Sequence, residues 1–242
     1  MTGGGRGIGA ATARLAVQAG YAVGIAYRQD RAAAEGIVAD IAASGGQALA
    51  VQADVSAEAD VTRLFAEVEA RLGPLSALVN NAGVLERQAR LDEMTPERWR
   101  RVLEVNVIGT LLCAREAVRR LSTRHGGAGG AIVNVSSRAA RLGAPGEYVD
   151  YAASKGAVES FTRGLARELA AEGVRVNAVS PGVIRTEIHA SGGEPGRPER
   201  VAPGIPMRRP GEPEEVAQAI LWLLSDAAAY VTGTVLEVAG GR

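Results

Sequence analysis

The chain has 242 residues, with 27 Lys or Arg balanced by 27 Asp or Glu, so its formal net charge is zero. The length favours one domain with a substantial core, and the charge balance gives no reason to expect nucleic acid or an anionic membrane surface as partner. A single cysteine, Cys113, excludes an intrachain disulfide, and two distant histidines give no metal-ligand spacing. With neither a secretory leader nor a long apolar run, the sequence predicts a soluble cytoplasmic protein that binds no membrane and no metal.

The chain opens with a glycine-rich turn, TGGGRGIG, at residues 2–9. The spacing of Gly3, Gly7 and Gly9 lets the backbone turn tightly and brings amide groups and a helix N-terminus against a phosphate. Such a loop normally follows a buried strand, which places it at the carboxyl edge of a parallel sheet. Only Met1 precedes it here, so we expect the first strand to be missing, Met1 to stand where that strand would end, and the native chain to carry further apolar residues before it.

The rest of the chain alternates short apolar runs with longer stretches of helical periodicity. The short runs predict buried strands at residues 21–27, 47–53, 75–80, 131–136, 174–180 and 234–238. The longer stretches predict helices at residues 7–19, 30–44, 57–72, 95–124, 151–172 and 212–225. Asp30, Ser56 and Thr95 are the expected capping residues of three of these helices. The alternation predicts an α/β fold, a doubly wound parallel sheet with helices on both faces.

One segment, residues 186–213, is rich in Gly, Pro, Arg and Glu and has no clear periodicity. So long an irregular piece in a compact domain is either functional or disordered. Because it follows the carboxyl end of the strand expected at 174–180, we expect a substrate lid here rather than a linker. The domain prediction is a single domain over residues 1–242, with the lid at about 186–213; the motifs described next imply that it is a dinucleotide-binding catalytic domain.

The glycine loop resembles the T-G-x-x-x-G-x-G fingerprint of the short-chain dehydrogenase/reductase family. Further matches to the family follow in order along the chain: Asp54-Val55, Asn80-Asn81-Ala82-Gly83, Asn106, Ser137, Tyr151-x-x-x-Lys155, and Pro181-Gly182 followed by Thr186. The resemblance implies a Rossmann-like fold, a nicotinamide cofactor, a small carbonyl or alcohol substrate and a homotetramer. Within the family, the chain looks most similar to a bacterial branch described as glucose 1-dehydrogenase-like or 3-oxoacyl-carrier-protein reductase-like.

Tyr151 and Lys155 are four residues apart in a helical stretch, so their side chains share one face. A tyrosine with the ordinary pKa of about 10 transfers protons poorly at neutral pH, and a nearby ammonium group would lower that pKa. Lys155 is the only lysine of the chain, all other basic residues apart from histidine being arginine. We therefore expect Tyr151 to be the general acid or base and Lys155 its activator.

Two more residues complete the expected catalytic set. Ser137 follows an apolar strand at the sheet edge where ligands bind, and its hydroxyl can hydrogen-bond a substrate carbonyl oxygen as charge develops. The family pattern favours Ser137 over Ser136. The resemblance gives Asn106 a part in holding a water that links the lysine to solvent, the alternative being a buried asparagine with no catalytic part. The complete set argues against the rival hypothesis of a catalytically silent NADP-binding sensor or scaffold.

The cofactor prediction rests on the end of the strand at 21–27. NAD-binding members of the family carry an acidic residue there, whereas this chain has Tyr27 followed by Arg28, and Arg6 lies in the glycine loop. Two arginines and no carboxylate predict a pocket for a 2′-phosphate, hence NADP(H) rather than NAD(H). The resemblance adds these cofactor-binding residues: Gly3, Gly7, Ile8, Gly9, Asp54, Val55, Asn80, Ala82, Gly83, Tyr151, Lys155, Pro181, Gly182, Val183 and Thr186.

The sequence leaves two substrate classes open. An acyl-carrier-protein substrate needs a basic docking patch, which Arg138, Arg141 and the arginines of the lid segment would provide. A sugar needs several polar side chains in the pocket, for which Glu147, Glu187 and His189 are candidates.

Overall fold

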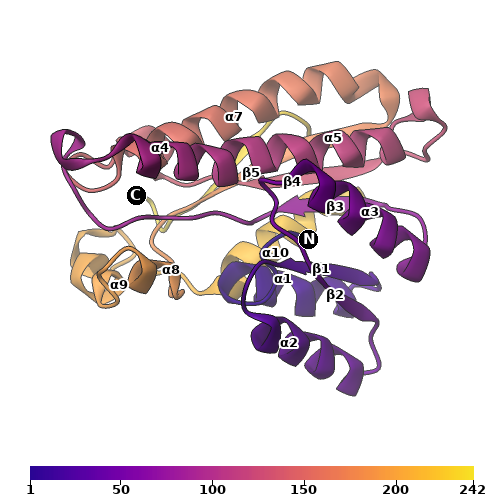
Figure 1. The fold of residues 1–242 in the computed structure, drawn as a ribbon, viewed down its shortest axis with the longest axis horizontal. Helices are drawn as coiled ribbons and strands as arrows, with labels where there is room; N and C mark the ends of the chain where they lie inside the picture. The colour runs from indigo at the N-terminus through magenta and orange to yellow at the C-terminus, as the bar shows by residue number, and fades with distance from the viewer.

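Six strands, all paired in parallel, form the centre of the protein, and the computed structural model describes residues 1–242 throughout (Figure 1). One group pairs β1 (Val23–Tyr27) with β2 (Ala48–Gln52). The other contains, in spatial order, β3 (Ala77–Asn80), β4 (Gly130–Val135), β5 (Val174–Pro181) and β6 (Val235–Val238). Strands β4 and β5 are almost wholly buried because helices cover both faces, as the doubly wound prediction requires.

The first two residues join the two groups of strands. The backbone amide of Ala26 in β1 donates to the carbonyl of Met1 at 2.9 Å, and the amide of Thr2 donates to the carbonyl of Val79 in β3 at 3.0 Å. Beyond this short bridge, a cavity of about 90 Å³ separates β1 from β3, with Val23 and Leu75 among its walls. The prediction of six strands with a gap at the centre, partly filled by Met1, is therefore confirmed.

Two layers of helices cover the sheet (Figure 1). On one face α1 (Gly7–Gln18), α2 (Arg31–Ala43) and α10 (Pro213–Leu224) pack on the strands. On the other face lie α3 (Glu58–Leu72), α4 (Pro96–Leu103), α5 (Gly109–Leu121) and α7 (Val149–Leu169). The helix predicted at 95–124 is a single helical run in which a π-helical turn, η2 (Glu104–Ile108), separates α4 from α5. Such turns are often found at functional sites, and this one contains Asn106.

Capping follows the prediction at two of three positions. Asp30 accepts a hydrogen bond from the amide of Ala33, and Thr95 accepts one from the amide of Arg98. Ser56 was expected to cap α3, but the N-cap is Ala57. The Ser56 hydroxyl donates instead to Oδ1 of Asp54 at 2.6 Å, a local side-chain bond that holds it in the turn before the helix.

The segment expected to be irregular, residues 186–213, contains two short helices, α8 (Ile188–Ser191) and α9 (Arg197–Val201). A further short helix, α6 (Ala139–Leu142), follows β4. Single turns of 3₁₀ helix complete the structure at Leu91–Glu93, Thr123–His125, Ala170–Glu172, Ala202–Gly204 and Asp226–Ala228. None of the helices combines the length and the apolar character that crossing a membrane demands.

Candidate active site

A cleft of about 780 Å³ lies at the carboxyl edge of the sheet, where residues at or just after the ends of β1 to β5 line it. The predicted residues that line it are Gly3, Arg6, Gly7, Ile8, Tyr27, Arg28, Asp54, Val55, Ala82, Gly83, Ser137, Tyr151, Lys155, Pro181, Gly182, Val183 and Thr186. The lining does not include Gly9, Asn80 or Asn106. These three residues lie behind the surface of the cleft.

The glycine loop forms one wall of the cleft and leads into α1. Gly3 and Gly7 have φ values of +63° and +51°, a left-handed conformation that side chains with a Cβ rarely adopt. A Cβ at Gly9 would lie 2.2 Å from the carbonyl oxygen of Gly3, so only glycine lets the loop close on the helix. The N-terminus of α1 and the loop amides together provide a site suited to a pyrophosphate.

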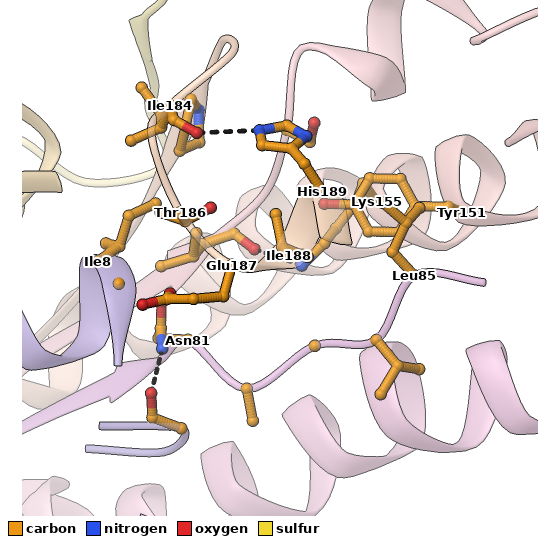
Figure 2. A pocket seen from close by; sticks show the side chains of 18 of the residues that line it. Ile8, Asn81, Leu85, Tyr151, Lys155, Ile184, Thr186, Glu187, Ile188 and His189 are labelled. Atoms are coloured by element: carbon orange, nitrogen blue, oxygen red, sulfur yellow. Dashed lines mark hydrogen bonds between the residues drawn. The ribbon is translucent and has the colours of Figure 1, made fainter. Parts of the chain in front are cut away.

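Asn81 holds this loop in place, a role the sequence prediction missed. Its side-chain amide donates to the carbonyls of Thr2 at 3.1 Å and Gly3 at 2.8 Å, and Figure 2 shows it reaching across to the loop. The Thr2 hydroxyl in turn accepts from the amides of Asn81 and Ala82. The pair Asn80-Asn81 at the end of a strand could have indicated this role, since adjacent side chains there point in opposite directions and one of the two faces the loop.

Asn80, predicted to bind the cofactor, is buried and turned into the sheet. Its side-chain amide donates to Oδ1 of Asn134 on β4 at 3.0 Å. The Asn134 amide then donates to the Thr162 hydroxyl on α7 at 2.9 Å. Asn80 therefore connects β3 to β4, and Asn134 connects β4 to α7.

Tyr151 and Lys155 project from one face of α7 into the cleft (Figure 2). Lys155 Nζ lies 5.7 Å from the centre of the Tyr151 ring and donates to the carbonyl of Val135, at the end of β4, at 2.7 Å. Burial lowers the pKa of Lys155 to about 8. Burial also raises the pKa of Tyr151 to about 12, while the Ser137 hydroxyl and the Arg197 guanidinium lower it by less. The pKa of Tyr151 is thus raised, not lowered by Lys155 as expected, because desolvation of the phenolate has the largest effect.

The two serines after β4 have different surroundings. Ser137 lines the cleft, and its hydroxyl oxygen accepts from the amide of Ala139 at 3.1 Å, which fixes it at the start of α6. The side chain of Ser136 is buried against α7, where its hydroxyl lies 3.3 Å from the carbonyl of Lys155 and 3.2 Å from Oε1 of Glu159. Ser137 is therefore the serine whose hydroxyl faces the ligand space.

Asn106 is completely buried beside the catalytic helix. Its Oδ1 accepts from the amide of Val84 at 2.8 Å, and its Nδ2 donates to the carbonyl of Val84 at 3.1 Å and to the Ser154 hydroxyl at 3.0 Å. The side chain thus joins the loop after β3 to α7 at the residue preceding Lys155. This geometry places Asn106 against the turn of α7 that carries Lys155.

The far end of the cleft lies where β1 ends. Tyr27 and Arg28 line it, and Nη1 of Arg28 lies 3.9 Å from Oδ2 of Asp54. Asp30 also borders the cleft, but its carboxylate accepts the amide of Ala33 as the N-cap of α2. Arg6 approaches from the glycine loop, so two guanidinium groups border this end.

The opposite end of the cleft is covered by the segment 186–213. His189 and Arg197 line it from that segment, and Glu147 and Tyr148 line it from the loop before α7. Arg197 forms an ion pair with Glu147, which fastens the segment to the body of the domain.

Comparisons with known proteins identify the family of the chain. A family model described as enoyl-(acyl carrier protein) reductase matches residues 3–242. The chain is 57% identical over 242 residues to the uncharacterized oxidoreductase YgfF of Escherichia coli, covering 100% of this chain and 98% of that protein. It is 41% identical to a 3-oxoacyl-[acyl-carrier-protein] reductase of Synechocystis, covering 100% and 94%.

A solved structure of 3-ketoacyl-(acyl-carrier-protein) reductase from Brucella melitensis, complexed with NADH, superposes with a TM-score of 0.92 at 34% identity, covering 100% of this chain and 96% of that one. The chain therefore belongs to the short-chain dehydrogenase/reductase family, oxidoreductases that use a nicotinamide dinucleotide.

Proposed function

We propose that this oxidoreductase interconverts a carbonyl group and a secondary alcohol with NADP(H), and that Tyr151 is its general acid and base. The observation that carries the proposal is the meeting of Ser137, Tyr151 and Lys155 at one end of a single cleft whose other end holds Arg28. The nicotinamide, when bound, supplies or accepts the hydride. The protein's own residues bind and orient the substrate oxygen and move its proton.

In this proposal Ser137 donates a hydrogen bond to the substrate oxygen and Tyr151 gives or takes the proton. The Tyr151 pKa near 12 suits a phenol that holds its proton until a developing alkoxide draws it. The Lys155 ammonium favours the phenolate that results, and its hydrogen bond to Val135 keeps it within reach of Tyr151. Asn106 holds α7 in position through Ser154.

NADP(H) is favoured over NAD(H) by the charges at the adenosine end. Arg6 makes no ion pair or side-chain hydrogen bond, and the guanidinium of Arg28 comes no closer than 3.9 Å to a carboxylate oxygen. Both side chains are therefore free to turn toward a phosphate. The last residue of β1 is Tyr27, which brings no negative charge to the place where a carboxylate would bind the ribose 2′-hydroxyl.

A small substrate fits better than an acyl carrier protein, although the Synechocystis and Brucella relatives are named for that substrate. Arg138 donates to the carbonyl of Arg242 at 2.7 Å and pairs with Glu237, and Arg141 pairs with Glu159 at 3.3 Å. Three of the four arginines in the segment 186–213 also pair with carboxylates, namely Arg197, Arg200 and Arg209. The basic patch that docking would need is thus largely neutralised.

We also propose a cytoplasmic homotetramer. Exposed apolar side chains gather at α10 and the loop before β6, where Trp222 and Tyr230 are 42% and 103% exposed, and at the π-helical turn, where Leu103 and Ile108 are 45% and 46% exposed. Such patches suit contacts between subunits. Light scattering on the purified protein gives the assembly mass.

The proposed function is tested with purified protein, reduced cofactor and a panel of ketones and aldehydes, followed by loss of nicotinamide absorbance. Tyr151→Phe should lower kcat/KM by about a thousandfold, since it removes the proton donor. Titration of cofactor fluorescence should show that the variant still binds NADPH, which separates lost chemistry from lost folding. Full activity in Tyr151→Phe, or cofactor binding without any turnover in the wild type, would contradict the proposal and favour a sensor or scaffold.

A further inference from the structure

Three buried polar atoms of residues lining the covered end of the cleft make no hydrogen bond of 3.5 Å or less within the protein, although the Gln88 side chain lies near enough to the Tyr148 hydroxyl to offset part of the rise in its pKa that burial causes. They are Oη of Tyr148, Nδ1 of His189 and Nε of Arg197, and they make up three of the seven such side-chain atoms in the chain. Tyr148 is 3% exposed and His189 is 7% exposed. Buried polar groups are nearly always paired, so this concentration marks a place where a ligand supplies the missing partners.

The hydrogen-bonding character of His189 follows from its other nitrogen. Nε2 lies 2.9 Å from the carbonyl oxygen of Ile184, as the dashed line in Figure 2 shows. A carbonyl oxygen only accepts, so Nε2 carries the proton of a neutral ring. Burial lowers the pKa of His189, which keeps the ring neutral at neutral pH. Nδ1 is therefore a bare acceptor that requires a donor from the ligand.

The other two atoms complement this acceptor. Arg197 Nε–H is a donor only, whereas the Tyr148 hydroxyl both donates and accepts. The two side chains are adjacent, since Cζ of Arg197 lies 5.5 Å from the centre of the Tyr148 ring. Tyr148 is the N-cap of α7, three residues before Tyr151, so the group of unpaired atoms lies next to the proposed proton donor.

The charges nearby exclude an anionic ligand group. Nη2 of Arg197 is paired with Glu147, and Nε of Arg197 lies 3.8 Å from Oε2 of Glu194, beyond hydrogen-bond distance but close enough for Coulombic attraction. Glu194 also accepts from Gln88 and pairs with Arg200. A carboxylate or phosphate entering here would meet no unpaired cation and two carboxylates, whereas an uncharged hydroxyl group would be accommodated.

We propose that Tyr148, His189 and Arg197 form a hydroxyl-binding subsite, and that the substrate is an uncharged carbonyl compound or secondary alcohol with a second hydroxyl group near the reacting carbon. That hydroxyl donates to His189 Nδ1 and accepts from Arg197 Nε–H or from Tyr148. This assignment rests on the proposed function, because the placement of the hydroxyl is relative to Tyr151. A substrate lacking the hydroxyl leaves buried polar atoms unpaired and is disfavoured.

The test compares cyclohexanone with its 2-, 3- and 4-hydroxy derivatives, using NADPH. The wild type should prefer at least one hydroxylated ketone over cyclohexanone by about tenfold or more in kcat/KM. Tyr148→Phe and His189→Leu should each lower that preference by about tenfold. The matched controls Tyr21→Phe and His125→Leu alter the same residue types at positions that do not line the cleft and should leave the preference unchanged.

The outcomes separate this inference from the proposed function. A wild type that reduces cyclohexanone, or an acetoacetyl thioester, at least as well as every hydroxylated ketone overturns the subsite while leaving the oxidoreductase intact. Equal losses on both substrate types in Tyr148→Phe also overturn it.

If no ketone is reduced, the subsite is tested by the increase in Tm of the NADP⁺-bound protein when an alcohol is added. A larger shift with cyclohexane-1,2-diol than with cyclohexanol, lost in Tyr148→Phe, supports the subsite, and equal shifts overturn it.

Discussion

Asn81 donates from its side-chain amide to the carbonyl oxygen of Gly3 at 2.8 Å, joining the end of β3 to the phosphate-binding loop. The two residues are 78 positions apart in the chain, and the sheet has a gap between β1 and β3 that the first residues of the chain bridge. The loop therefore depends on this side chain for its position above the cleft. A change at Asn81 should affect the cofactor more than the substrate.

Asn81→Ala should weaken binding of the reduced cofactor about tenfold, because two hydrogen bonds together contribute roughly 1–3 kcal/mol to the loop's position. Fluorescence titration gives the Kd. The matched control is Asn177→Ala, which removes a comparable bond to the carbonyl of Val231 at 2.8 Å outside the cleft. The control should lose stability and keep its Kd, and an equal loss of affinity in both variants would show that Asn81 has no special role.

Arg28→Asp should shift the cofactor preference toward NAD(H). The change removes a partner for a 2′-phosphate and adds a carboxylate that repels it but accepts a hydrogen bond from a ribose hydroxyl. We expect the ratio of kcat/KM for NADPH to that for NADH to fall by roughly a hundredfold, about 3 kcal/mol, measured in steady state with one ketone.

Arg31→Asp serves as the control for Arg28→Asp, since Arg31 lies three residues further along, pairs with Glu35 and does not line the cleft. A ratio unchanged by Arg28→Asp, or changed equally by Arg31→Asp, would remove the basis for preferring NADP(H).

At neutral pH the protein should be less stable with Lys155 than with an uncharged residue at that position, because folding buries the ammonium group. Its pKa is lowered from 10.5 to about 8 on folding, so below pH 8 the ammonium is charged in both states and the folded state bears the desolvation cost. Between about pH 8 and 10.5 the unfolded chain binds more protons than the folded one, so this cost is relieved as pH rises.

Lys155→Met should therefore be more stable than the wild type at pH 7. The gain in free energy of unfolding should be at most about 3 kcal/mol, and the loss of the hydrogen bond to Val135 should reduce it. Its advantage should shrink as pH increases from 8 to 10.5. Urea unfolding of both proteins across this range gives the difference in free energy of unfolding. A difference that stays constant with pH would mean that the lysine is not desolvated on folding.

The sequence was sufficient for the architecture because each strand and helix has a strong local pattern. The break between β1 and β3 was also predictable, since a glycine loop of this kind normally follows a strand at that place in the sheet. Sequence reasoning misjudged Asn80 and Asn81, because which of two adjacent side chains faces the loop depends on strand pairing with Asn134. It could not foresee the raised pKa of Tyr151 either, since burial is set by the whole cleft.

The covered end of the cleft was the least predictable part. Glu147 and His189 stood out as polar residues near the expected site, but neither partner could be foreseen. The partner of Glu147 is Arg197, 50 positions further along in the segment without periodicity, and a side-chain pair so far apart leaves no local pattern. The partner of His189 is the backbone carbonyl of Ile184, which every residue type offers equally. The tautomer of His189, which defines the hydroxyl-binding subsite, follows only from the position of the Ile184 carbonyl.

Arg98 and Asp150 form the ion pair that fixes the start of the catalytic helix. Nε and Nη2 of Arg98 donate to the two carboxylate oxygens of Asp150 at 2.6 and 3.1 Å, and the side chains are only 13% and 6% exposed. Arg98→Met leaves the carboxylate buried without its partner, one residue before Tyr151, and should lower the free energy of unfolding by about 3–5 kcal/mol.

The double variant Arg98→Met, Asp150→Leu should recover most of that loss, because neither charge then remains unpaired. Urea unfolding of the wild type, the two single variants and the double variant gives the coupling between the residues. The double variant should also keep measurable activity, since neither side chain lines the cleft. If the effects of the two single changes simply add, the pair contributes no coupling, and the position of α7 depends on its other contacts, such as the bond of Asn106 to Ser154.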